Sequence, residues 1–270
     1  MKVIALVGSA RKMGTYKAAE KFMHNLQSFG DIECEIISMS DYRLEVCKGC
    51  KLCFEKGEEF CPLKDDRNKL IEKMKNSDGV VFASPNYSFN VSGQMKIFLD
   101  RLGFVFHRPC FFGKVFTGIV VQGIYGGNKI TRYFNFIGKG LGFRVVKGCC
   151  LTFLEPPTDK DQKISDRILE KHSKKFYSSL IKGELSVPTF FELMIFRMGR
   201  TSIRLILDDS KRDYTYYNQN GWFGSLYYYP VKLNQFKKLA GRFFDFFFNR
   251  MFRKNVRKNN HLPRVQIKYS

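Results

Sequence analysis

Short apolar runs alternate with amphipathic stretches along the first two thirds of the chain. The apolar runs have the length and character of buried strands, and the stretches between them repeat apolar residues every three or four positions, which is typical of helices. Ala18, Phe22 and Leu26 follow this helical spacing. The pattern predicts strands at 2–7, 32–37, 79–83 and 115–122, with a fifth that begins at 143–146. It predicts helices at 15–29, from Asp65 and Asp66 onward, at 93–102, at 128–141 and from 164 to 183.

Strands and helices that alternate at this spacing favour right-handed crossovers and a parallel sheet covered on both faces. Five such units predict an α/β fold with a doubly wound, flavodoxin-like, five-stranded parallel sheet. Ligands of such sheets bind beyond the carboxyl ends of the strands, where the strand order reverses. The loops after the first, third and fourth strands are therefore the candidate site.

The first of these loops, residues 8–15, has the composition of a phosphate site. Its glycines let backbone N–H groups approach an anion, Ser9 and Thr15 add hydroxyl groups, and Arg11 adds a forked cation. The start of the following helix adds a favourable dipole. The loop is neither a Walker A motif nor a G-x-G-x-x-G turn, and a Gly-Ser turn before a helix is also a common plain connection.

The loops after the third and fourth strands combine aromatic rings with amides and glycines. Residues 83–96 hold a stiff proline, two rings and several amides, which can bracket a flat heterocycle and bond its edge. The alternative is a loop packed by its own aromatics and capped into the next helix by Ser92. Residues 122–128 contain three glycines and one ring, which also suits a simple tight turn.

Four cysteines form a C-x2-C-x2-C-x7-C-P run between the second strand and the next helix. Thiolates at this spacing can wrap one iron–sulfur cluster. Zinc is disfavoured because structural zinc sites pair two C-x2-C elements across a longer loop and no histidine lies nearby. Reduced thiols without a metal are the third reading. The run consists of Cys47, Cys50, Cys53 and Cys61, and the cysteines expected to pack instead are Cys34, Cys110, Cys149 and Cys150.

The composition favours a cytoplasmic protein with one sizeable domain and an appendage, or with two modest domains. The chain has 270 residues, of which 44% are hydrophobic. No run of about 18 apolar residues is present, and the amino terminus enters a strand without signal-peptide features. A reducing compartment is therefore expected for the cysteines. The net charge of +21 indicates attraction to an acidic surface without identifying it.

Over residues 1–183 the chain resembles the NADPH-dependent FMN reductase and iron–sulfur flavoprotein group of the flavodoxin-like superfamily. The resemblance rests on residues 8–11, on residues 84–87 followed by residues 90–96, on Asp100-Arg101, and on Gly123 with the glycines at 126–127. Relatives commonly carry Asn-Thr where this chain has Thr15-Tyr16, so a phenol stands in place of the second hydroxyl and Tyr16 is not counted among the phosphate donors. The resemblance implies that the FMN phosphate lies on Ser9, Arg11, Gly14 and Thr15. It implies isoalloxazine and ribityl contacts from Pro85, Asn86, Tyr87, Ser88, Phe89 and Asn90, and ring contacts from Gly123, Tyr125 and Gly126.

The activity that this resemblance implies is FMN-dependent oxidoreduction between NAD(P)H or a ferredoxin and an unknown acceptor. The cysteine run resembles the compact motif of iron–sulfur flavoproteins, which implies one [4Fe-4S] cluster and a homo-oligomer in which the two centres communicate. Flavin chemistry requires no catalytic side chain of the protein. The histidines are accordingly expected to be surface or packing residues, namely His24, His107, His172 and His261.

Residues 184–270 form a basic, aromatic-rich and mainly helical extension after the domain 1–183, which carries the cysteine loop 47–61. Within it, apolar residues recur at helical spacing among lysines and arginines over 236–252. Such a helix can pack on its own domain or a partner subunit, or lie on an anionic membrane surface. The alternative function is a basic binding protein for nucleic acid or acidic lipid without turnover. Nucleic acid is disfavoured because no recognisable motif accompanies the charge.

Overall fold

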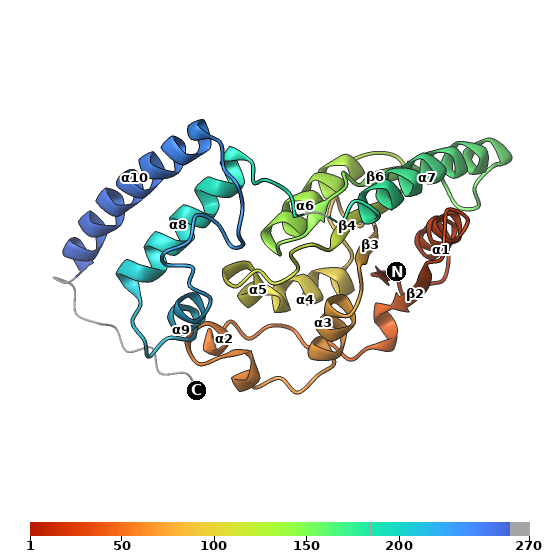
Figure 1. Ribbon diagram of the computed structural model, residues 1–270. Coiled ribbons are helices and arrows are strands. Elements are labelled where there is room, and N and C mark those ends of the chain that lie inside the picture. Colours follow the sequence, from red (N-terminus) through yellow and green to blue (C-terminus); the bar gives the residue numbers. More distant parts are fainter. Residues whose placement is uncertain (184, 260–270) are drawn as a thin grey trace. The chain divides into compact units, whose positions relative to one another are not determined.

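The computed structural model describes residues 1–183 and 185–259, except for the side chains of 255–259 (Figure 1). His261, Glu184 and the end of the predicted extension lie outside the described residues. By its contacts the chain forms two compact units. One comprises Met1–Cys47 and Leu63–Leu185, and the other comprises Lys48–Pro62 and the chain from Ser186 onward. The domain boundary predicted after residue 183 stays a prediction, and the second unit includes most of the cysteine loop.

The first unit contains the parallel sheet that the alternating pattern predicts. Its strand order is β2-β1-β3-β4-β5, with β6 also beside β4. Val7 pairs with Ser38 and Ala83, and Ala83 pairs with Ile119, so β1, β3 and β4 reach the same edge together. The loops after these strands therefore share one end of the sheet. The strands are β1 Lys2–Val7, β2 Glu33–Ser38, β3 Gly79–Pro85, β4 Val115–Gln122, β5 Arg144–Val145 and β6 Cys149–Thr152.

The fifth strand position is divided into two short strands. β5 pairs with the start of β4 and β6 pairs with its end. Between them, the hydroxyl of Thr117 donates to the carbonyl oxygen of Val146 at 2.9 Å and lies 2.9 Å from Nε2 of His172. The N–H of Val146 still donates to the carbonyl oxygen of Phe116 at 2.9 Å, so the backbone leaves the ladder after Val146 and returns at Cys149.

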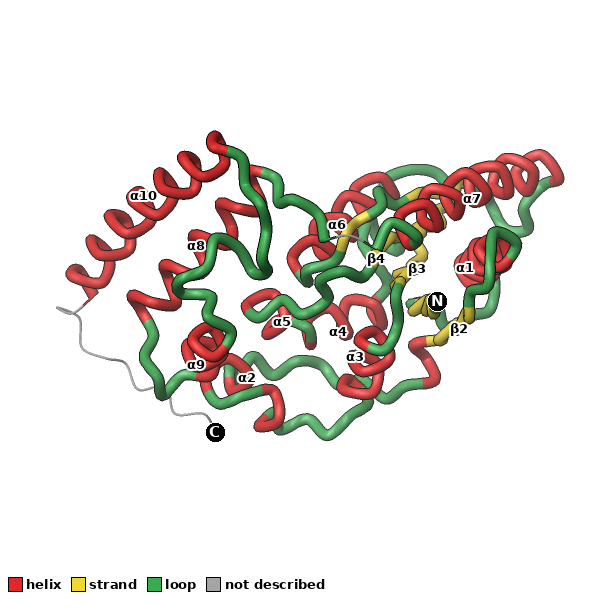
Figure 2. The backbone as a smooth tube through the Cα atoms, viewed as in Figure 1, coloured by secondary structure: helices red, strands yellow, loops and turns green. Residues whose placement is uncertain are grey.

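Helices cover both faces of the sheet (Figures 1 and 2). Helices α1 and α7 pack on one face, where the rings of Phe22 and Phe176 meet at 5.5 Å. On the other face Phe82 contacts Phe98 of α4 and Phe134 of α6. The predicted helices are confirmed, and short ones that periodicity did not show are added. The helices of this unit are α1 Gly14–Gln27, η1 Met39–Asp41, α3 Arg67–Lys75, α4 Gly93–Arg101, α5 Gly103–His107, α6 Gly127–Gly140 and α7 Asp159–Leu180.

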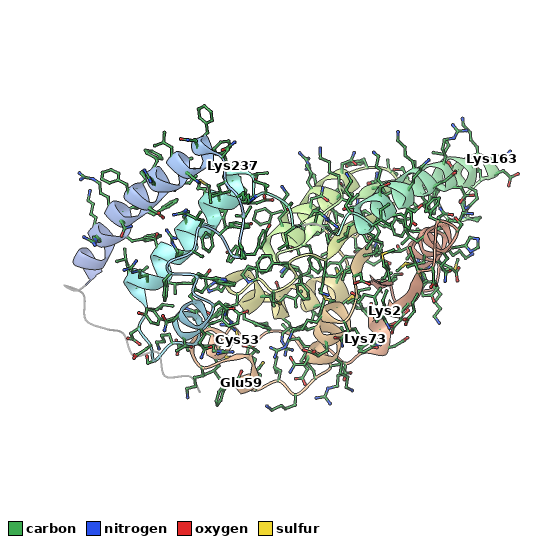
Figure 3. All side chains as sticks on the ribbon, viewed as in Figure 1. Lys2, Cys53, Glu59, Lys73, Lys163 and Lys237 are labelled. Atoms are coloured by element: carbon green, nitrogen blue, oxygen red, sulfur yellow. The ribbon has the colours of Figure 1, made fainter. Side chains whose placement is uncertain are left out.

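The second unit is helical, as predicted for the extension. Asp245 of α10 accepts hydrogen bonds at 2.5 Å from both Arg197 and Arg200 of α8, which holds these two helices together. Lys237 lies near the start of α10 (Figure 3). Its ammonium group lies over the ring of Phe190. Among the described residues, no helix combines the length and apolar character that crossing a membrane requires. Its helices are α2 Leu52–Glu55, η2 Glu58–Phe60, α8 Phe190–Ile206, α9 Arg212–Gln219 and α10 Gln235–Asn259.

Candidate functional site

The first loop leaves β1 and reaches the start of α1. Gly8 N–H donates to the carbonyl oxygen of Ala83 at 2.8 Å, which ties the loop to β3. The hydroxyl of Ser9 donates to the carbonyl oxygen of Arg11 at 2.9 Å, so the loop turns back on itself. The side chain of the N-cap residue Met13 accepts no hydrogen bond from the first turn of α1, and Thr15 is buried there. Free N–H groups at a helix start are suited to an anion.

A carboxylate from a distant part of the chain lies at this helix start. Oε1 of Glu155 accepts a hydrogen bond from Gly14 N–H at 2.9 Å, and Oε2 lies 3.9 Å from Nη2 of Arg11. Glu155 thus holds the position that a phosphate oxygen would favour beside α1. Reasoning from sequence missed this residue because it is separated from Gly14 by 141 positions and no local pattern connects the two.

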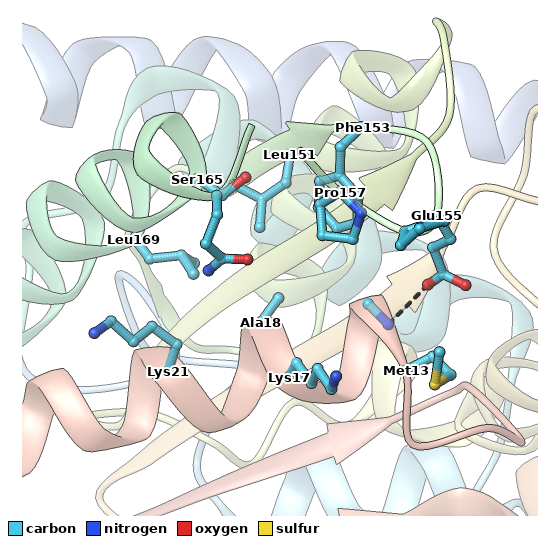
Figure 4. A pocket seen from close by; sticks show the side chains of 13 residues that line it. Met13, Lys17, Ala18, Lys21, Leu151, Phe153, Glu155, Pro157, Ser165 and Leu169 are labelled. Carbon is cyan, nitrogen blue, oxygen red and sulfur yellow. Dashed lines mark hydrogen bonds between the residues drawn. The ribbon is translucent and has the colours of Figure 1, made fainter. Parts of the chain in front are cut away.

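A cavity of about 350 Å³ adjoins the first loop between α1 and α7 (Figure 4). Its floor is apolar and includes Leu151, Phe153 and Leu169. Lys17 and Lys21, one turn apart on α1, add two cations to its wall. The volume is at the lower end of the range for ligand pockets. The cavity therefore extends the candidate site from the first loop toward α7.

The loop after β3 makes a two-residue turn with unusual backbone angles. Tyr87 and Asn90 pair across the turn, and the intervening Ser88 and Phe89 have φ values of 49° and 63°. Both values lie in the left-handed region, where residues other than glycine carry strain. The turn lifts its rings away from the sheet, and Tyr87 and Phe89 are each more than half exposed.

Asn86 joins this turn to the loop after β4. Its backbone N–H donates to the carbonyl oxygen of Val121 at 2.8 Å, and its side-chain amide donates to that of Tyr125 at 2.9 Å. The rings of Phe89 and Tyr125 meet at 5.2 Å. Gly126 has a φ of 97°, and a Cβ there would lie 2.7 Å from Phe89. The two predicted ring-binding loops therefore form one aromatic edge.

This edge fits a flat ligand with polar groups on its rim. Oδ1 of Asn86 is buried and has no hydrogen-bond partner among the described residues, so an acceptor is left over. Exposed aromatic faces can stack on a flat heterocycle, and a buried amide oxygen without a partner can accept a hydrogen bond from the rim of such a ring. Asn90, in contrast, uses its side-chain oxygen on the N–H of Val91 at 2.8 Å.

Gln122 is a site residue that sequence reasoning left out. Its Oε1 accepts from Gly127 N–H at 2.6 Å, and its Nε2 donates to Thr152 Oγ1 at 2.9 Å. The nearly buried amide thus fixes the loop after β4 against β6. Its position as the last residue of a predicted strand, at the edge where ligands bind, is the sequence signal that could have identified it. The hydroxyl oxygen of Ser92 accepts a hydrogen bond from the N–H of Met95 at 3.3 Å and so caps α4, as the alternative structural interpretation of this loop predicted.

The cysteine run lies in an irregular segment with two short helical turns, α2 and η2. Cys47 is exposed, and the other three members are partly buried. Among the residues that the structure describes, no three His, Cys, Asp or Glu side chains are placed to hold a metal ion. The cluster therefore stays a prediction. Burial raises the pKa of Cys34 to about 11 and that of Cys149 to about 12, in keeping with their predicted packing roles.

The sequence profile of the NADPH-dependent FMN reductase family matches residues 1–153. An iron–sulfur flavoprotein of Archaeoglobus fulgidus is 31% identical over 227 residues, which cover 82% of this chain and all of that protein. An iron–sulfur flavoprotein of Methanocaldococcus jannaschii is 40% identical over 101 residues, which cover 37% of this chain and 51% of that protein.

Solved structures share the fold. The crystal structure of RosB with bound 8-demethyl-8-formylriboflavin-5'-phosphate has a TM-score of 0.57 and 12% identity, and covers 87% of this chain and 92% of that one. The structure of an NAD(P)H:quinone oxidoreductase of Methanothermobacter marburgensis has a TM-score of 0.51 and 16% identity, and the match covers 64% of this chain and 98% of that one. At these identities the likeness concerns architecture alone, and it confirms the doubly wound α/β fold.

Proposed function

This chain belongs to the NADPH-dependent FMN reductase and iron–sulfur flavoprotein family and is an FMN-dependent oxidoreductase, and on that premise we propose that it takes electrons from NAD(P)H. A ferredoxin is the alternative donor, and the acceptor is a second, unidentified molecule. The family description supports the nicotinamide donor. The non-enzymatic binding function is not favoured.

The residues that would hold FMN come from the three loops at one sheet edge. Ser9, Arg11, Gly14 and Thr15 would take the phosphate, and the turn from Pro85 to Asn90 would face the ring and its ribityl chain. Gly123, Tyr125 and Gly126 would border the ring on the other side. Bound flavin supplies hydride and single-electron chemistry, while the protein orients the ring and limits access of water to it.

The observation that carries this proposal is the junction of the second and third loops at Asn86. A titration of purified apoprotein with FMN, followed by quenching of flavin fluorescence, tests it. We expect tight binding by the wild type and a loss of about tenfold or more for Asn86→Ala, because that variant releases the loop after β4. Asn76→Ala, at the exposed end of α3, is the matched control. Wild-type protein that fails to take up FMN would refute the proposal.

A [4Fe-4S] cluster on Cys47, Cys50, Cys53 and Cys61 is the second part of the proposal. Four thiols in a compact run are the right donor set, and relatives named iron–sulfur flavoproteins support the assignment. As placed, the thiols do not form a metal-binding group, so no electron step is assigned to the cluster. A homo-oligomer and a reducing, cytoplasmic location accord with this reading.

Iron and sulfide analysis of anaerobically purified protein tests the cluster. We expect Cys50→Ala to lose iron while it keeps flavin, and Cys110→Ala to keep both. Zinc in place of iron, or iron retained by Cys50→Ala, would contradict a cluster on four cysteines.

A further inference from the structure

Helix α10 carries an exposed apolar stripe that the fold of its own unit leaves uncovered. Five large side chains lie along one face, four of them spaced three or four residues apart and the fifth adjacent to the fourth, and each is between 50% and 77% exposed. At 1.5 Å per residue the stripe is about 17 Å long. Single exposed apolar residues are ordinary, but a continuous row of this size marks an interaction surface. The stripe consists of Phe236, Leu239, Phe243, Phe246 and Phe247.

The opposite face of α10 is the one that packs against α8. Phe248 is buried there, and Gly241 brings the helix close to Arg197. Asp245 on the same face pairs with Arg197 and Arg200. Because the face with Phe248 and Asp245 already provides the packing of α10 on α8, the stripe is not needed to complete the core of the helical unit.

The charge around the stripe has one sign. Helix α10 contains eight lysines and arginines and a single acidic residue, Asp245, which faces α8. Arg250 and Lys254 continue the line of the stripe over the next two turns. None of the exposed cations makes an ion pair among the described residues, and these are Lys238, Arg242, Arg250, Arg253 and Lys254.

We propose that the apolar stripe of α10 docks on an anionic lipid bilayer surface, with Phe243, Phe246 and Phe247 inserted at the boundary between headgroups and acyl chains. Apolar rings need a medium that excludes water, and the unpaired cations beside them need negative charge. A bilayer surface with acidic headgroups supplies both at the same depth. The helix would then lie in the plane of the surface while its inner face stays on α8.

The same charges disfavour a second copy of this chain as the partner. A two-fold contact would bring identical faces together, and each would carry several cations with no free carboxylate on α10 to receive them. Like charges opposed at a desolvated contact are repulsive. Nucleic acid would satisfy the cations, but it offers no apolar layer for a continuous row of phenylalanines.

Sedimentation of the full-length protein with vesicles tests the proposal. We expect binding to vesicles that contain phosphatidylglycerol, and weak or no binding to phosphatidylcholine alone. The triple variant Phe243→Ser, Phe246→Ser and Phe247→Ser should lose about tenfold or more in affinity while the unit stays folded, since these side chains are exposed. Phe136→Ser, an exposed phenylalanine of α6, is the matched control and should bind as the wild type does.

A depth measurement separates insertion from simple attraction of charge. Phe246→Trp adds a fluorophore to the stripe, whereas the chain's own Trp222 is 5% exposed and gives a constant background. Brominated acyl chains should quench the new tryptophan. The proposal is overturned if no quenching occurs, if the serine variant binds as tightly as the wild type, or if heparin binds while acidic vesicles do not. It is also overturned if the wild type ignores vesicles and the serine substitutions instead dissociate an oligomer.

Discussion

Asp65 and Arg101 form a buried ion pair with two hydrogen bonds that fastens both ends of the cysteine segment to the end of α4. Asp65 also accepts from the N–H of Glu45 at 2.9 Å, and Arg101 donates to the carbonyl oxygen of Glu45 at 3.0 Å. Burial opposes ionisation of Asp65, but the hydrogen bonds from Glu45, Arg101 and Arg67 outweigh it and lower its pKa. The pair thus holds the chain before Cys47 against the chain after Cys61.

Breaking this pair from one side should destabilise the protein strongly. Arg101→Met leaves a buried carboxylate without its cation, and a cost of about 3–5 kcal/mol is expected. Urea unfolding followed by circular dichroism measures it. The double variant Asp65→Asn, Arg101→Met should cost less than the two single changes added together, because neither charge is then left alone. Costs that simply add would show that the two side chains act independently.

Glu155 should weaken binding of the FMN phosphate because its carboxylate lies at the start of α1. Glu155→Gln keeps the hydrogen-bond acceptor and removes the charge. We expect FMN affinity to rise about fivefold, corresponding to about 1 kcal/mol of like-charge repulsion near the surface. Fluorescence titration measures the change, which should shrink at high salt. Glu170→Gln, exposed on α7, is the control, and weaker binding by Glu155→Gln would show that the charge instead orders the loop.

Gly126 should resist substitution because its backbone and its surroundings both exclude a side chain. Gly126→Ala forces alanine into a left-handed conformation, which costs about 1–2 kcal/mol, and places its Cβ against Phe89. We expect lower stability and weaker flavin binding. Gly93→Ala is the matched comparison, since nothing lies within 4 Å of a Cβ there and the residue is helical. If the two variants have the same stability and flavin affinity, the backbone angle and the contact with Phe89 do not require glycine at position 126.

His172 should make stability depend on pH in the acidic range. Burial, aided by Lys175, lowers its pKa from 6.5 to about 4. Between these values the unfolded chain binds a proton that the folded chain does not, so stability falls as pH decreases from 6.5 toward 4. The loss should reach about 3 kcal/mol, and thermal or urea unfolding at several pH values measures it.

The variant His172→Gln should flatten this part of the profile, even if the altered contact with Thr117 lowers stability at neutral pH. His24→Gln changes an exposed residue of α1 and should leave the profile as it is. An unchanged slope in His172→Gln would assign the acid sensitivity to other groups.

The strands, the main helices and the loops that meet at one sheet edge could all be predicted from the amino-acid sequence. Their signals are local: β1 and α1 show their periods within a few residues, and parallel strands place their carboxyl ends together. The cysteine run and the basic phenylalanine helix were equally visible because each is a pattern over short spacing.

The contacts between distant residues could be seen only in the folded protein. No spacing rule brings Glu155 to Gly14, Gln122 to Thr152 or Asp65 to Arg101, since each depends on how separate elements pack. The packing of α10 on α8 likewise decided which phenylalanines are covered and which form the stripe. Sequence periodicity identifies a helix and its apolar positions, but only the position of its neighbours determines which of them meets water.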